Sequence, residues 1–120
     1  MSMFEKKLTV GQLRLHYLHR ANEDLRDKNY DAAREDIKNF IRTIDQESLK
    51  NKNLFERILR LLEKEENVEK RIGRILRKVG YPEQALILNI ADMQFRRRYL
   101  ERAVEVAWML AQKERLFEEL

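Results

Sequence analysis

The chain of 120 residues has no cysteine, one proline and three glycines. The absence of cysteine excludes a disulfide framework and any metal site built from thiolates. So few glycines and prolines cannot supply the turns that a protein with many strands needs. No apolar run approaches the length of a membrane span, and the N-terminus lacks the pattern of a secretory signal. These absences predict a cytoplasmic, all-α protein forming a single domain over residues 1–120, with a loose lead-in over 1–8.

Charge, in contrast, is abundant, at 38% of residues. This exceeds the usual quarter and, together with the lack of cysteine, fits a heat-adapted source. The net charge is +4 and uneven: residues 51–100 carry 12 basic and 7 acidic side chains, whereas residues 101–120 carry 3 and 5. A basic middle can attract phosphate or acidic protein surfaces. A solvated helical surface is the simpler interpretation of so small an excess.

Apolar residues at intervals of three and four predict about six helices. Thr9 with Gln12 fits a capping box at the start of the first. The expected helices cover about 10–28, 31–44, 53–64, 68–80, 82–95 and 99–117. Breaks are expected at Asn29, at Gly80 before Pro82, and over 96–98. Residues 65–67 form either a turn or part of one continuous helix. Short connections would pack consecutive helices antiparallel, either as a stack of hairpins or as a compact bundle.

Small residues recur twelve positions apart, and this spacing suits close helix packing on either side of a tight turn. The pairs are Ala21 with Ala33, Gly73 with Ala85, and Ala91 with Ala103. The segment 17–44 resembles a tetratricopeptide-type repeat, with Tyr17, Ala21, Tyr30, Ala33 and Ile37 in the characteristic places. Two further matches are formed by Gly73, Leu76, Gly80, Pro82 and Ala85, and by Ala91, Leu100 and Ala103. The resemblance implies a solenoid-like scaffold that binds peptides or partner proteins on a concave face.

No sequence motif for catalysis stands out, and no nucleophile elbow, phosphate loop or dinucleotide fingerprint occurs. His16 and His19 lie three residues apart, with Glu23 one turn on, but two imidazoles alone rarely hold a metal. Asp92 lies in an apolar stretch, where it is either a buried carboxylate or, as we favour, an ion-pair partner of Arg96. We therefore predict no enzyme, no cofactor and no metal. The hypothesis of an enzyme using Asp92 or the two histidines stays open as a third choice.

Two surfaces are candidates for binding. The basic one consists of Lys70, Arg71, Arg74, Arg77, Lys78, Arg96, Arg97 and Arg98. The apolar one, near the C-terminus, consists of Trp108, Met109, Leu116, Phe117 and Leu120. The sequence thus favours a non-enzymatic helical interaction module that binds a protein partner or self-associates as a dimer. The alternative is a small basic protein that binds nucleic acid, alone or as a subunit of a nucleoprotein complex.

Overall fold

The computed structural model describes residues 7–78 and 82–118, with side chains except those of 76 and 82–92. These residues form four α-helices and one short 3-10 helix, without strands. The elements are α1 (Val10–Arg26), α2 (Tyr30–Arg42), η1 (Gln46–Ser48), α3 (Lys52–Lys78) and α4 (Pro82–Lys113). The prediction of an all-α fold is confirmed. The prediction of about six helices is wrong, because the third and fourth, and the fifth and sixth, are continuous.

Two polar triplets account for the miscount. Residues 65–67 lie inside α3 and residues 96–98 lie inside α4. Glutamate and arginine are good helix formers, so neither triplet breaks a helix by itself. Their polarity has a tertiary reason: Arg96 Nε donates to Glu65 Oε1 at 2.7 Å across the α3–α4 interface. Side chains that we expected in exposed connections therefore pair with each other.

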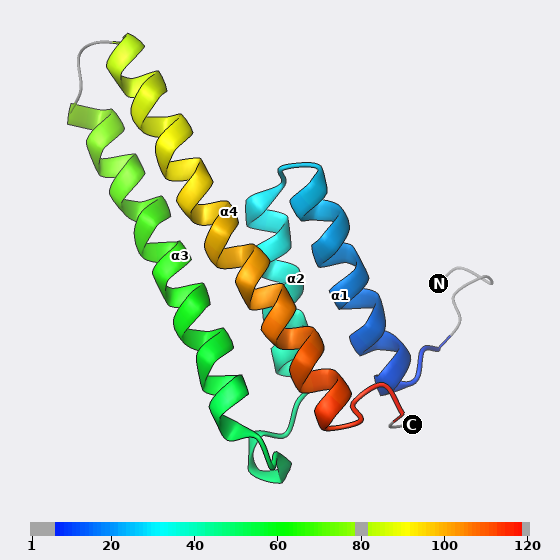
Figure 1. The fold of residues 1–120 in the computed structure, drawn as a ribbon. Coiled ribbons are helices and arrows are strands. Elements are labelled where there is room, and N and C mark those ends of the chain that lie inside the picture. Colours follow the sequence, from blue (N-terminus) through cyan, green and yellow to red (C-terminus); the bar gives the residue numbers. More distant parts are fainter. Residues whose placement is uncertain (1–6, 79–81, 119–120) are drawn as a thin grey trace.

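The helices form a short hairpin and a long one, and α4 packs against all three other helices (Figure 1). The long hairpin of α3 and α4 extends past the turn between α1 and α2 (Figure 1). The molecule is flat and elongated, with principal extents of 53 × 39 × 19 Å and a radius of gyration of 16.8 Å. A compact domain of this length would have a radius of gyration of about 14 Å. The excess reflects the protruding hairpin.

The helix ends show which local predictions hold. Thr9 and Gln12 form the predicted capping box, each backbone N–H donating to the other side chain. The left-handed residue after α1 is Lys28, with φ of 62°, rather than Asn29. The N–H of Asn29 donates to Asp24 O, which closes the chain into a Schellman turn. Pro82 begins α4, where proline is favoured.

The main core lies where the short hairpin packs on the long one. Its fully buried side chains include Leu18, Ile37, Phe40, Ile58, Leu100 and Leu110. Ala21, Ala33 and Ala103 are also fully buried, as close helix packing requires. We call residues 9–66 and 93–118 the body, and residues 67–78 and 82–92 the arm. The twelve α3 residues of the arm span about 18 Å at the rise of an α-helix.

Candidate interaction surface

Glu65 joins the arm to the body. Its carboxylate is fully buried and accepts from Arg34 Nη1 of α2 at 2.9 Å and from Arg96 Nε of α4 at 2.7 Å. Both guanidinium groups are themselves largely covered, with 16% and 12% of the side chains exposed. A buried charge is tolerated only when it is paired and hydrogen-bonded. The pairing therefore fixes α2, α3 and α4 in one arrangement at the base of the arm.

Asp31, at the start of α2, completes this junction. Arg96 Nη2 donates to Asp31 Oδ1 at 2.6 Å, and the Arg96 guanidinium lies 5.8 Å from the centre of the Tyr30 ring. Burial alone would lower the pKa of Arg96, but the hydrogen bonds to Glu65 and Asp31 outweigh it and raise that pKa. Arg96 thus remains charged and bound within the molecule. It is not available to an outside partner, and we leave it out of the binding surface.

Beyond this junction, α3 presents its basic residues to solvent. Lys70, Arg71, Arg74, Arg77 and Lys78 are all exposed, and we call them the basic face. Within the described part of the chain, Lys70, Arg74 and Lys78 have no carboxylate within ion-pair distance. Arg77 Nε donates to Gly73 O, one turn back. The structure therefore groups five of the eight predicted basic residues on one end of the molecule.

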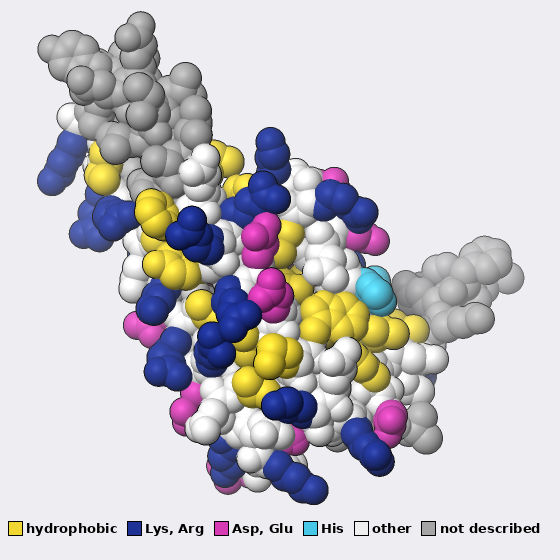
Figure 2. Space-filling model, in the orientation of Figure 1, with side chains coloured by type: hydrophobic (Ala, Val, Ile, Leu, Met, Phe, Trp, Pro, Cys, Tyr) yellow, Lys and Arg dark blue, Asp and Glu magenta, His cyan; other side chains and the backbone are white. Residues whose placement is uncertain are grey.

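The remaining two basic residues of the prediction lie on α4 and have local contacts. Arg97 Nε donates to Glu101 Oε1 at 2.6 Å, one turn on. The Arg98 guanidinium lies 5.9 Å from the centre of the Phe95 ring, and that phenylalanine is 45% exposed. Figure 2 shows side chains of both signs over the body, where basic and acidic groups lie side by side.

The predicted apolar surface is divided by the structure. Leu116 belongs to the core, with 3% exposed, because the Schellman turn at Arg115 folds it back against the helices. Trp108 is half-buried and packs its ring 5.5 Å from that of Phe117 and 5.2 Å from that of His19. Met109 is exposed, and Leu120 lies outside the described residues. The four described residues of this surface do not form one continuous exposed stripe.

The residues considered for catalysis lie apart. His16 and His19 are both exposed on α1, and no group of three metal-ligating side chains occurs in the described residues. The side chain of Asp92 is outside the described set. Arg96, its predicted partner, binds Glu65 and Asp31, and the predicted pair with Asp92 stays a prediction.

Two buried carboxyls that sequence analysis missed lie between α1 and α2. Asp36 of α2 is hydrogen-bonded to Asp24 of α1, and each has one buried carboxyl oxygen without a partner in the described structure. Burial, followed by the hydrogen bond and negative charge of Asp24, raises the pKa of Asp36 from 3.8 to about 7, against the opposing effect of Arg20. Protonation of Asp36 removes its repulsion with the neighbouring carboxylate. The helical position of both residues could not reveal that they face each other.

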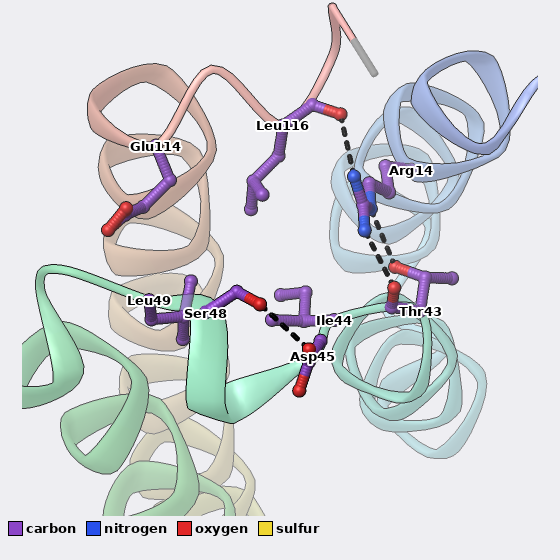
Figure 3. Close-up of a pocket in the computed structure, with 8 residues that line it drawn as sticks. All are labelled: Arg14, Thr43, Ile44, Asp45, Ser48, Leu49, Glu114 and Leu116. Atoms are coloured by element: carbon purple, nitrogen blue, oxygen red, sulfur yellow. Dashed lines mark hydrogen bonds between the residues drawn. The ribbon is translucent and has the colours of Figure 1, made fainter. Parts of the chain in front are cut away.

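A cavity of about 160 Å³ lies at the opposite end of the body from the arm (Figure 3). Arg14 dominates it, and its guanidinium donates to Thr43 Oγ1, Thr43 O and Leu116 O. Glu114 accepts from the N–H groups of Lys50 and Asn51, which precede α3. These bonds tie the ends of all four helices together, so the polar groups of this cavity serve the fold.

Comparisons with protein-family models, with curated proteins and with solved structures found no match for this chain. Of the described helices, none combines the length and the hydropathy needed to cross a membrane. The function therefore has to be argued from the geometry of the molecule, above all from the arm.

Proposed function

We propose that this protein is a non-enzymatic helical interaction module that binds a protein partner through the basic face of the arm. The observation that carries the proposal is the location of the charge. Residues 67–78 contain five basic side chains and one acidic one, a balance of +4 that equals the net charge of the whole chain. The rest of the chain contains twenty basic and twenty acidic residues. An anionic partner is therefore attracted to one place on the molecule.

The body supports this proposal as a rigid base for the arm. Glu65 and its two arginines hold the long hairpin against α2 without using any residue of the basic face. The resemblance of residues 17–44 to a tetratricopeptide-type hairpin, with Ala21 and Ala33 fully buried in its interface, also favours a binding scaffold.

The proposal is tested by affinity capture. The 120-residue chain is the bait, and the cells are those that express it naturally. We expect a stoichiometric complex with another protein when the eluted material is weighed by native mass spectrometry. The double variant Arg74→Glu/Arg77→Glu should lose that complex. The control Arg57→Glu/Arg60→Glu, which reverses two exposed cations of α3 within the body, should retain it. Elution of the chain alone would contradict the proposal.

Nucleic acid is the second candidate, because closely spaced cations also match a row of phosphates. It predicts that the captured material is lost on nuclease treatment and that binding falls steeply with salt. If the protein self-associates, native mass spectrometry should show a complex that contains this chain alone, at twice its mass.

A further inference from the structure

The arm has an uncovered face on the side where α2 lies against the body. Glu66, Lys70, Gly73 and Arg77 follow one another at intervals of four, three and four residues, so they share one face of α3. At Glu66 this face meets Lys38 of α2, and that ion pair lowers the pKa of Glu66. Because α2 begins at Tyr30, beside Arg96, it does not extend further along the arm. The hollow that continues this face has a volume of about 550 Å³ and is lined by described residues of α3 alone.

Gly73 lies in the middle of that hollow. A Cβ built on Gly73 would have Arg77 Nη2, at 3.9 Å, as its nearest described side-chain atom, which is an ordinary contact distance. Packing among the described residues therefore does not require glycine here. Inside a helix, glycine lowers stability relative to alanine because its backbone loses more freedom on folding. Glycine does allow another backbone to approach closely. Glycine here therefore leaves room for a second helix to pass close over α3, although the side chain of Ala85, its predicted packing partner, lies outside the described set.

The charges around Gly73 indicate what that helix carries. Lys70, Arg74 and Arg77 line the hollow together with the single carboxylate of Glu69. A second copy of this chain would bring its own cations against these, so like charges oppose an arm-to-arm dimer. A nucleic acid carries a continuous row of phosphates, so one of them would lie near the carboxylate of Glu69 and be repelled by it. A helix can instead place carboxylates opposite the three cations and a neutral or basic side chain opposite Glu69.

We propose that the arm binds an acidic helix of a partner protein, which continues the line of α2 along the face from Glu66 to Arg77. The helix crosses α3 at Gly73, and its carboxylates pair with Lys70, Arg74 and Arg77. This inference rests on the proposed function, since it specifies the partner class and the place where the partner lies.

The test uses the full chain and a labelled synthetic 20-residue helix of alanine and glutamate, with glutamate at helical spacing on one face. Fluorescence anisotropy measures its binding at low salt. We expect Arg74→Glu/Arg77→Glu to weaken binding by about tenfold or more, and Arg57→Glu/Arg60→Glu to change it by less than about twofold. The same peptide with lysine in place of glutamate should not bind.

Substitution of Gly73 separates binding from folding. We expect Gly73→Ala to raise the urea midpoint of the chain, because alanine stabilises the helix, and Gly73→Leu to leave the chain folded. Both should weaken peptide binding, and leucine more than alanine, because the larger side chain keeps the peptide backbone further from α3. Binding that is unchanged in folded Gly73→Leu would overturn the crossing at Gly73.

Three results would overturn the acidic helix as the partner. One is the absence of binding by the wild-type chain at low salt. Another is equal binding of the glutamate and lysine peptides. The third is a 20-base-pair DNA duplex that binds more tightly than the glutamate peptide and loses its binding in Arg74→Glu/Arg77→Glu. The proposed function fails separately: it fails if affinity capture yields no protein partner, whereas a captured partner that is unaffected by the arm variants contradicts only the site.

Discussion

In the body, the buried charge of α3, Glu65, meets Arg34 and Arg96 on two neighbouring helices, whereas the exposed Arg57 and Arg60 form no ion pair with a described residue. In the arm, Lys70, Arg74 and Lys78 of the same helix α3 form no ion pair with any described residue. The body also has one continuous apolar core, whereas Val68 and Ile72 of the arm are buried outside it. The two regions thus share their long helices but not their surroundings. The body packs around a core of its own, whereas three exposed cations of the arm have no ion pair among the described residues.

The strongest test of this comparison is the removal of Glu65. Replacing it with alanine leaves Arg34 and Arg96 close together and without their shared carboxylate, so we expect a loss of about 3–5 kcal/mol in the free energy of unfolding. Urea denaturation followed by circular dichroism measures it. Glu63→Ala, an exposed residue of the same helix, should cost less than about 0.5 kcal/mol. Equal effects of the two substitutions would show that the junction does not hold the arm.

A pair of isoleucines compares the two apolar regions directly. Ile58 is fully buried in the body. Changing it to alanine should lower the free energy of unfolding by about 3–4 kcal/mol, because the tight core cannot close the cavity that is left. Ile72 of the arm is 7% exposed. Ile72→Ala should lower the free energy of unfolding by about half as much in urea denaturation, since fewer neighbours surround this side chain. Native-state hydrogen exchange should likewise show the arm opening at lower free energy than the body. An Ile72→Ala cost as large as that of Ile58→Ala would remove the distinction.

The short hairpin should make the stability of the body depend on pH. The folded-state pKa of Asp36, about 7, lies above its ordinary value of 3.8. The native chain therefore holds a proton that the unfolded chain has released, and stability falls as pH rises from about 4 to about 7, then levels off. We expect Asp36→Asn to stabilise the chain by about 1–3 kcal/mol at pH 8 and to flatten this dependence.

Thermal unfolding between pH 5 and pH 8 checks this prediction. Glu35→Gln, which changes an exposed carboxylate on the same helix, is the control and should keep the wild-type slope. A wild-type stability that rises over this range would contradict the raised pKa of Asp36.

The smallest expected effect concerns the turn that ends α1 in the body. Lys28 has a left-handed backbone, with φ of 62°, which disfavours side chains that carry a Cβ. Lys28→Gly should therefore raise the free energy of unfolding by about 0.5–1 kcal/mol. Asp27, with φ of −86°, gains nothing from glycine, so Asp27→Gly should destabilise the chain. The same denaturation assay distinguishes the two variants.

Local features of the chain were predictable from sequence because they depend on neighbouring residues. The scarcity of glycine and proline and the apolar spacing indicated an all-α fold. The Thr9 capping box and the start of α4 at Pro82 followed from residues within one turn. The basic face was also predictable, since five cations on one side of a helix need no tertiary information.

Only the tertiary structure decided that α3 and α4 are continuous and that one end of their hairpin is left uncovered. Glu65 pairs with Arg34 and with Arg96, each 31 residues away in sequence, and such contacts leave no trace in local propensity. A buried glutamate and an exposed one are the same residue type in the sequence and have the same preference for helix. The surroundings that distinguish them, and that leave the basic face open while covering Glu65, arise only when distant helices pack.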